Sequence, residues 1–313
     1  MKRIFLSAPH IAGRERALVD AVFESNYVAP AGEMLARFEA DLCRYTGAGH
    51  CVALASCTAA LHLALINLGI GPGDEVWTSS MTFMGGVSSI VFVGATPVFF
   101  DLDPARWTID PLLLAEALTE AASANRLPKA ILPTDLYGQA CDLAAIRAIA
   151  DRYGIPVVCD SAEALGAFDH GMHAGVGARA MALSFNGNKI ITTSGGGALL
   201  SDDETFVARA RYLSTQARQP VSHYEHTEIG YNYRLSNVSA AIGVGQLEQI
   251  EEKVSRRRAI FGRYKVELGD LPGVEFMPEP VGLRSSRWLT CLTVDPRSAG
   301  TNATQIVGAL EVQ

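Results

Sequence analysis

A single lysine stands in the stretch FNGNKIITTSGGG, residues 185–197, and no carboxylate lies closer along the sequence than Asp202. A lysine attacks an aldehyde only when it is neutral, so a nucleophilic lysine is expected away from carboxylates and near positive charge or apolar groups. The same residues also fit a hairpin, in which Asn186-Gly187 forms a type I′ turn between strands ALSF and KIITT. In that arrangement Lys189 points into water. The stretch therefore holds either a nucleophile or an ordinary surface lysine.

A second candidate for chemistry is the segment Ser56-Cys57-Thr58-Ala59, which follows the apolar run CVALA and opens a helix pattern. Backbone N–H groups at a helix N-terminus bind anions, and the hydroxyls of Ser56 and Thr58 add donors, so the segment suits a phosphate group. Serine and threonine are also ordinary helix N-caps. The segment is therefore either a phosphate cup or a cap.

Two further candidates follow expected strands. Asp160 ends the apolar run IPVVCD, just before Ser161-Ala162-Glu163. A buried carboxylate is costly unless it meets a cation, a metal or a hydrogen-bond donor, although an N-cap would also explain an aspartate here. Phe83, in SMTFMGG, fits the flat wall of a site, while most aromatic residues at such positions belong to the core.

Taken together, these candidates match the needs of pyridoxal phosphate (PLP). This cofactor requires an anion cup for its phosphate, a flat or apolar wall for its ring, a carboxylate that keeps its pyridine nitrogen protonated and a lysine that forms a Schiff base. The sequence contains no H-E-x-x-H or G-x-S-x-G pattern, and its seven histidines are scattered. We therefore expect PLP as the cofactor and no metal.

Short apolar runs alternate with longer helical patterns, which predicts an α/β fold with a large, mostly parallel sheet flanked by helices. Ligands bind beyond the carboxyl ends of the strands in such sheets. After residue 178 the runs ALSF, KIITT and GALLSD indicate antiparallel or mixed strands. The strands expected before that point are CVALA (51–55), DEVWTS (74–79), TPVFFD (96–101), KAILPT (129–134) and IPVVCD (155–160).

Helical patterns cover 110–124, 142–153, 203–217 and 235–268, and the charged run EEKVSRRR in the last of these fits a solvated helix face. We expect a large PLP-binding α/β domain over residues 1–250. Residues 251–313 are expected to begin a smaller C-terminal domain.

Composition narrows the class of protein. The 313 residues carry a formal net charge of −7 without a cluster of basic residues, which disfavours nucleic-acid binding. The six cysteines form no C-x-x-C pair and favour a reducing compartment. No signal-peptide core or membrane-length apolar stretch is present. We therefore expect a cytoplasmic protein that does not bind a membrane.

Seven stretches that span nearly the whole chain carry a family resemblance. They are SNYVAPAGE, ASCTAALHLAL, GPGDEVWTSSMTF, LYGQACDL, CDSAEALGA, SFNGNKIITTSGGGALL and GYNYRLSNV. In this order they resemble the DegT/DnrJ/EryC1/StrS sugar aminotransferases, which have the aspartate aminotransferase fold (fold type I). The sequences of the segments NGNKIITTSGGG, STQAR and HYEH are most similar to those of family members from the bacillosamine pathway. Those members convert a UDP-linked 4-keto-6-deoxy-N-acetylhexosamine into its 4-amino sugar, with glutamate as the amino donor.

The resemblance implies a role for each matching position. Lys189 would form the internal Schiff base and move the proton during a two-stage transamination, and Asp160 would hold the pyridine nitrogen. An obligate homodimer with shared active sites is also implied. The remaining implied contacts are Glu163 near the cofactor's 3-hydroxyl, Phe83 stacked on the ring, Cys57, Thr58 and Ser184 on the phosphate, Asn232 on the phosphate of the neighbouring subunit's site, and Asn26, Tyr27, Val28 and Ala29 on the sugar nucleotide.

The sequence differs from the family pattern in two places. Asp135 precedes Leu-Tyr-Gly where relatives often have histidine, so no role of that histidine transfers. The chain ends in ATQIVGALEVQ, inside a helix pattern, whereas relatives continue with a stretch that closes over the substrate. The small domain is therefore expected to be incomplete. Alternatives are an aminotransferase for a GDP- or dTDP-linked keto sugar and a non-catalytic dimer of the same fold. Lys189 argues against a related dehydratase, which has histidine at this position.

Overall fold

The apolar runs form a central sheet in the computed structural model of the protein, which describes residues 4–11 and 13–311. The strands of this sheet are β1 (His50–Leu54), β2 (Glu75–Ser79), β3 (Thr96–Phe100), β6 (Ala130–Leu132), β7 (Val158–Asp160), β10 (Ala180–Ser184) and β11 (Gly197–Ser201). Their order is β3-β2-β6 in one part and β7-β10-β11-β1 in the other. Parallel bridges from Ile131 to Val157 and from Thr134 to Asp160 connect β6 with β7, so the two parts continue into each other.

The sheet is mostly parallel with one reversed strand. β2 runs parallel to β3 and β6, and β10 runs parallel to β7. β11 is antiparallel to both of its neighbours, β10 and β1. The expected α/β fold with a mostly parallel, mixed sheet is therefore confirmed, including the change of strand direction after residue 178.

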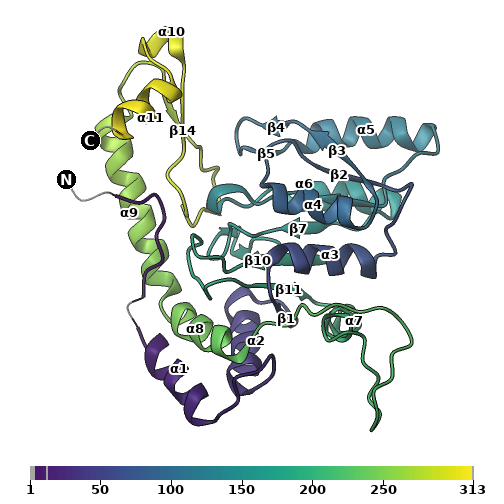
Figure 1. Cartoon of the computed structure of the whole chain (residues 1–313). Coiled ribbons are helices and arrows are strands. Elements are labelled where there is room, and N and C mark those ends of the chain that lie inside the picture. The colour runs from purple at the N-terminus through teal and green to yellow at the C-terminus, as the bar shows by residue number, and fades with distance from the viewer. Residues whose placement is uncertain (1–3, 12, 312–313) are drawn as a thin grey trace.

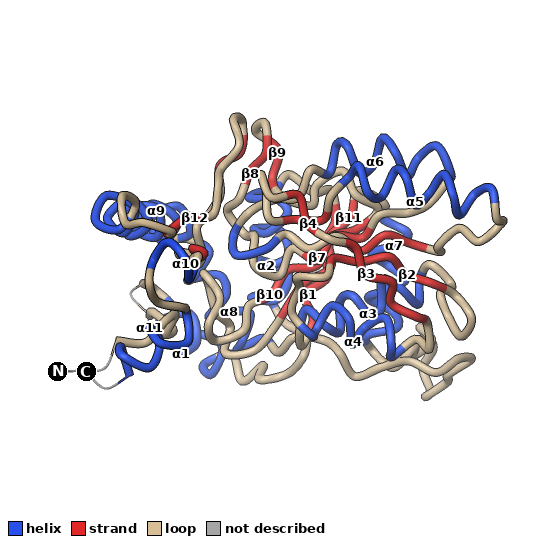
Figure 2. Tube along the Cα trace, turned by 90° about the horizontal axis from the view of Figure 1, so that it is seen from above, coloured by secondary structure: helices blue, strands red, loops and turns tan. Residues whose placement is uncertain are grey.

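Helices cover both faces of the sheet. In Figure 2 the strands lie between α5 and α6 on one side and α3 and α4 on the other (Figures 1 and 2). The helices are α1 (Glu15–Glu24), α2 (Glu33–Thr46), α3 (Cys57–Asn67), α4 (Met84–Phe92), α5 (Pro111–Ser123), α6 (Leu143–Ala150), α7 (Glu204–Ser214), α8 (Asn237–Leu247), α9 (Ile250–Leu268), α10 (Pro296–Ala299) and α11 (Ala303–Glu311), with 3₁₀ turns at Leu136–Gly138 and Asp151–Tyr153.

Alternate residues of each strand enter two different cores. Successive side chains of a strand point to opposite faces, so Cys51 and Ala53 of β1 pack in one cluster and Val52 and Leu54 in the other. The first cluster includes residues of α2, α5, α6 and α8, and the second includes residues of α3, α4 and α7. This two-sided burial explains why the strands read as continuous apolar runs rather than as alternating patterns.

Residues 250–311 extend away from the sheet as α9, a small antiparallel ladder and the last two helices (Figure 1). The ladder is formed by β12 (Val274–Phe276) and β14 (Leu292–Val294). The predicted domain boundary at residue 250 coincides with the start of α9 and stays a prediction. Between these elements, β13 (Leu283–Arg284) pairs with β8 (Phe168–Asp169), which also pairs with β9 (Met172–His173). A further hairpin joins β4 (Leu102–Asp103) to β5 (Thr108–Ile109).

Two sequence predictions of local structure were wrong. The expected hairpin of ALSF with KIITT is absent from the described residues, because β10 pairs with β11 and residues 185–196 form the loop between them. The expected helix over 235–268 is two helices, α8 and α9, interrupted at Glu248 and Gln249. Gln249 leaves the helical region with φ −110° and ψ 8°, which lets α9 take a new direction.

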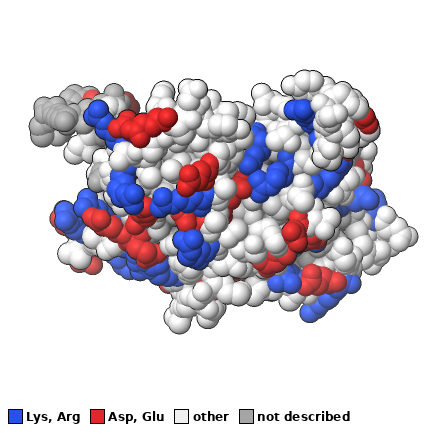
Figure 3. All heavy atoms as spheres, turned by 90° about the horizontal axis from the view of Figure 1, so that it is seen from below, with Lys and Arg blue, Asp and Glu red and all other residues white. Residues whose placement is uncertain are grey.

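The surface carries both signs of charge. On the face seen in Figure 3, Lys and Arg side chains are interspersed with Asp and Glu side chains. None of the helices in the described part of the chain combines the length and apolarity needed to cross a membrane.

Candidate active site

A cavity of about 310 Å³ lies beyond the carboxyl ends of β1, β7 and β10, where α/β sheets bind ligands. We call it the strand-end pocket. Its lining residues are Ala55, Ser56, Cys57, Thr58, Leu61, Phe83, Gly85, Gly86, Asp160, Ala162, Glu163, Ser184, Asn186, Asn188, Lys189, Gly195, Gly196 and Trp288.

Lys189 points into this pocket and not into water. Its side chain is only 10% exposed. A tight turn after β10 places it there, because the N–H of Lys189 donates to the carbonyl oxygen of Asn186 at 3.0 Å. Neither Asn186 nor Gly187 has a positive φ, so the turn is not the type I′ turn that the sequence suggested. The surface-lysine interpretation is therefore wrong.

Lys189 also has a carboxylate partner, contrary to the expectation from the sequence. Its Nζ lies 3.1 Å from Oε1 of Glu163, which is distant along the chain but adjacent in space. The other oxygen of Glu163 accepts the backbone N–H of Tyr137 at 2.8 Å. Both side chains of the ion pair are at most 10% exposed, so solvent screens their attraction only weakly. Lys189 is thus held as one half of a buried ion pair.

Asp160 lies at the end of β7 and is 3% exposed. Its Oδ1 accepts the N–H of Ala162 at 3.2 Å and faces the thiol of Cys57 at 3.8 Å. Oδ2 faces the backbone of Gly86 and receives no hydrogen bond from any residue that the structure describes. A turn and not an α-helix follows Asp160, so the helix N-cap alternative is wrong.

The pKa of Asp160 is raised to about 6, chiefly by burial and also by the nearby charge of Glu163, while the Ala162 N–H and Lys189 act in the opposite direction. A cation bonded to Oδ2 would favour the ionised form and reverse this effect. The pocket therefore contains an acceptor that is suited to a positively charged N–H group.

The phosphate cup forms at the start of α3. Ser56 is the N-cap, and its Oγ accepts the N–H of Ala59 at 3.0 Å, so the cap interpretation holds for this hydroxyl. The N–H groups of Cys57 and Thr58 have no hydrogen-bond partner among the described residues. Ser184, at the end of β10, also lines the pocket and has a hydroxyl donor. These donors lie where the helix dipole favours an anion.

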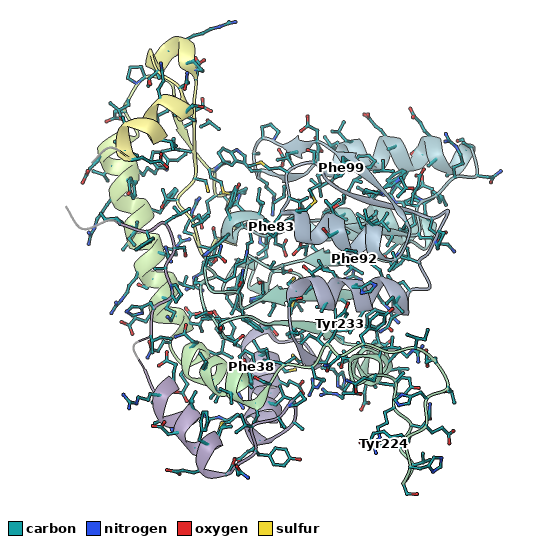
Figure 4. All side chains as sticks on the ribbon, viewed as in Figure 1. Phe38, Phe83, Phe92, Phe99, Tyr224 and Tyr233 are labelled. Atoms are coloured by element: carbon teal, nitrogen blue, oxygen red, sulfur yellow. The ribbon has the colours of Figure 1, made fainter. Side chains whose placement is uncertain are left out.

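Phe83 forms a wall of the pocket and not part of the core. It precedes α4 and is 70% exposed in this chain (Figure 4). Gly85 and Gly86, which follow Phe83 in α4, allow the backbone to lie close to Thr58 and Asp160. A Cβ on Gly85 would lie 2.9 Å from Oγ1 of Thr58, and one on Gly86 would lie 2.7 Å from Oδ2 of Asp160. Room for a flat ring therefore depends on glycine at both positions.

Sequence reasoning missed Trp288. It lies 4% exposed in the loop before β14, and its ring centroid is 4.2 Å from Nζ of Lys189. Its indole Nε1–H donates to the carbonyl oxygen of Asn188 at 2.8 Å. Trp288 stands in the stretch SSRWLTCL, which contains no motif, and only the tertiary fold brings it to the pocket.

Several predicted site residues lie outside the pocket of their own chain. Asn232 is on the long segment between α7 and α8, and its Oδ1 accepts a hydrogen bond from Gln216. Tyr224 is near the far end of this segment (Figure 4). Asn26, Tyr27, Val28 and Ala29 form the loop between α1 and α2, which Asn237 holds through hydrogen bonds to the carbonyl oxygens of Tyr27 and Ala29. The expected roles of these five residues stay predictions.

The residues of the strand-end pocket fit PLP. The pocket has a helix N-terminus with open N–H donors, a flat aromatic wall, a buried carboxylate with an unpaired oxygen and a buried lysine. Each of these groups meets one chemical requirement of the cofactor. The described residues contain no group of three or more His, Cys, Asp and Glu side chains that could hold a metal ion.

Comparison with known proteins shows the class of this protein: it is an enzyme that uses PLP to transfer an amino group to a sugar. Residues 9–313 match the model of the DegT/DnrJ/EryC1/StrS aminotransferase family, and the chain belongs to this family. EpsN of Bacillus subtilis (strain 168), assigned as a PLP-dependent aminotransferase, is 47% identical over 294 residues, which cover 94% of this chain and 76% of EpsN.

Two further relatives extend the comparison. A GDP-perosamine synthase from Caulobacter vibrioides is 38% identical over 271 residues, covering 87% of this chain and 71% of the synthase. The PLP form of Spr1654 from Streptococcus pneumoniae, assigned as a sugar aminotransferase, superposes with a TM-score of 0.86 at 29% identity, covering 93% of this chain and 78% of that structure. The expected family, fold, cofactor and enzyme class are therefore confirmed.

Proposed function

We propose that the enzyme transfers the amino group of glutamate to C4 of a UDP-linked 4-keto-6-deoxy-N-acetylhexosamine, giving a bacillosamine-type amino sugar for glycan synthesis. The observation that carries the reaction is the burial of Lys189 Nζ in the strand-end pocket, together with Asp160 and the cup at the start of α3. The similarity of NGNKIITTSGGG, STQAR and HYEH to bacillosamine-pathway members supports the substrate.

The pocket residues divide the work of holding the cofactor. We assign the phosphate to the N–H groups of Cys57 and Thr58 and the hydroxyl of Ser184. Phe83 covers one face of the ring. Asp160 accepts the pyridine N–H through Oδ2, and Glu163 faces the ring hydroxyl.

When bound, PLP supplies an aldehyde carbon for a covalent bond and a protonated ring that takes up electrons from the reacting carbon. Lys189 provides the amine for that bond. Once it is displaced, its Nζ removes a proton from one reacting carbon and returns it to another. The ionised form of Asp160 maintains the positive charge on the ring nitrogen. Glu163 is in contact with Nζ and therefore orients the lysine for these transfers.

We also propose that two copies of the chain share their active sites. In this arrangement Asn232 of each copy reaches the phosphate of the other, and Asn26, Tyr27, Val28 and Ala29 contact the sugar nucleotide. The placement of these residues away from the pocket of their own chain supports the proposal.

A GDP-linked keto sugar is the second candidate substrate, because a GDP-perosamine synthase is 38% identical to this chain. A dTDP-linked keto sugar is the remaining alternative. The three differ in the nucleotide, so their relative rates with one enzyme preparation distinguish them.

The decisive experiment has two stages. Borohydride reduction of the cofactor-loaded protein, followed by peptide mass spectrometry, is expected to find the adduct on Lys189; a colourless protein without an adduct would contradict the proposed chemistry. Glutamate-dependent loss of the keto sugar nucleotide is then measured with UDP-, GDP- and dTDP-linked substrates. Activity with GDP- or dTDP-linked sugar but none with the UDP-linked sugar rejects the substrate alone.

A further inference from the structure

We propose that Trp288 is a positioning residue for Lys189, delivered to the strand-end pocket by the C-terminal part of the chain. The inference rests on the proposed role of Lys189 and adds to it a second contact that no motif indicated. It concerns the orientation of the lysine amine before the covalent bond to the cofactor forms.

Trp288 contacts both the backbone and the side chain of the lysine turn. The face of its ring lies 4.2 Å from Nζ of Lys189, within the range in which a ring attracts an ammonium group. At the other end of the indole, Nε1–H donates to the carbonyl oxygen of Asn188, the residue before the lysine. One rigid side chain therefore fixes the turn at Asn188 and limits the directions in which Nζ can point.

The loop that carries Trp288 is itself tightly held. The adjacent Arg287 is 3% exposed, has φ +49°, and its Nη1 donates to the carbonyl oxygen of Met277 at 2.9 Å. Its guanidinium also lies 3.8 Å from the ring centroid of Phe261 and 3.4 Å from Glu279. A non-glycine residue with positive φ costs energy and persists only where its surroundings require it. The contacts of Arg287 hold its backbone in this conformation, and this conformation determines where Trp288 points.

A second set of contacts connects this loop to Glu163. The N–H of Ser286 and the hydroxyl of Ser285 both donate to the carbonyl oxygen of Gly138, at 2.8 and 2.7 Å. Gly138 has φ +96°, and a Cβ there would lie 2.7 Å from the backbone nitrogen of Trp288. Tyr137, the residue before it, donates its N–H to Glu163. The loop that carries Trp288 therefore also supports the position of Glu163, the other partner of Lys189.

These two partners act on Nζ in different ways. Glu163 attracts the ammonium through charge, whereas the ring of Trp288 presents an apolar face that also tolerates the neutral amine. Since the amine must lose its proton before it attacks, a partner that retains contact with both forms keeps the nucleophile in place through that change.

The test measures the rate at which the cofactor-free protein forms its covalent bond with added PLP, followed by visible absorbance and confirmed by borohydride trapping at Lys189. Trp288→Leu removes the ring, and Trp288→Phe keeps a ring face but loses the N–H donor. Trp77→Leu and Trp77→Phe are matched controls, because Trp77 is 5% exposed in the same core and its Nε1–H also has a partner, Glu75.

We expect Trp288→Leu to lower the bond-forming rate about tenfold and Trp288→Phe about threefold, with both Trp77 variants at the wild-type rate. Wild-type rates in both Trp288 variants would overturn the proposal, as would an equal slowing by Trp77→Leu. If Trp288→Leu does not fold, the two Phe variants decide: slowing in Trp288→Phe alone supports the proposal, and no slowing in either overturns it. Absence of an adduct on Lys189 in the wild-type protein would instead contradict the proposed function.

Discussion

Replacing Asp160 by asparagine is expected to stabilise the cofactor-free protein, although Asp160 is assigned a central role in the reaction. Its buried carboxyl has a pKa of about 6 instead of the ordinary 3.8, with burial as the largest cause. Each pKa unit is worth about 1.4 kcal/mol, so ionising this group in the folded protein costs about 3 kcal/mol more than in the unfolded chain.

The sign of the pH dependence follows from the raised pKa. Below pH 3.8 the carboxyl is protonated in both states and costs nothing. Between about pH 3.8 and 6 the unfolded chain loses its proton while the folded protein keeps it, so the folded protein loses stability as the pH rises; above about 6 both states are ionised and the loss stays constant. Asparagine carries no charge at any pH. The advantage of Asp160→Asn should therefore grow from roughly 1 kcal/mol at pH 4.5 to about 3 kcal/mol above pH 7.

The assay is urea unfolding of the cofactor-free wild type and variant at several pH values and one protein concentration. Asp135→Asn is the control, because Asp135 is equally buried but accepts the N–H of Cys141 and the hydroxyl of Ser161. That variant should lose about 1–3 kcal/mol, since asparagine cannot accept at both positions. An Asp160→Asn protein that is less stable than wild type at pH 8, or whose advantage does not change with pH, would refute the reasoning.

Three further predictions concern the same pocket. Gly86→Ala should greatly weaken PLP binding, measured by absorbance titration, because the new Cβ would lie 2.7 Å from Asp160; Gly262→Ala, where no atom lies within 4 Å, should bind normally. Glu163→Gln keeps the acceptor for the Tyr137 N–H and removes a negative charge that raises the pKa of Asp160, so the stability loss with rising pH should end at lower pH and be smaller; an unchanged profile would argue against this coupling. Equal mixing of inactive Lys189→Ala and Asn232→Ala proteins should restore about one quarter of wild-type activity, because half of the dimers are mixed and each has one intact site; no recovery after subunit exchange would mean that Asn232 acts within its own chain.

Much of the sheet was predictable because its strands are buried on both faces. The runs CVALA and IPVVC contain no charged residue, so their pattern is clear, and Asp160 stands out because a carboxylate after such a run needs a partner. The KIITT run was misassigned, because β-branched residues favour strands locally but β11 supplies the better partner for β10. Tertiary pairing overrode local propensity there.

The electrostatic surroundings of Lys189 were not predictable from neighbouring residues. Glu163 reaches it from the end of another strand, and Trp288 reaches it from the loop before β14. Sequence distance says nothing about either contact, because both depend on how β7, β10 and the C-terminal loop are arranged. The order of the motifs located the pocket, and the structure was needed to identify which side chains face the lysine within it.

The position of β1 has a consequence for synthesis of the protein on the ribosome. β1 pairs only with β11 among the described strands, so residues 50–54 have no strand partner until residues 197–201 have left the exit tunnel. During much of that interval α3, whose residues Leu61, Leu63, Ala64 and Leu65 are all buried in the finished fold, lacks β10 and β11, the two strands with which it makes most contacts. Such an exposed apolar helix is prone to aggregation and is a natural target for chaperones. The phosphate cup at its start thus forms only after most of the sheet has been made.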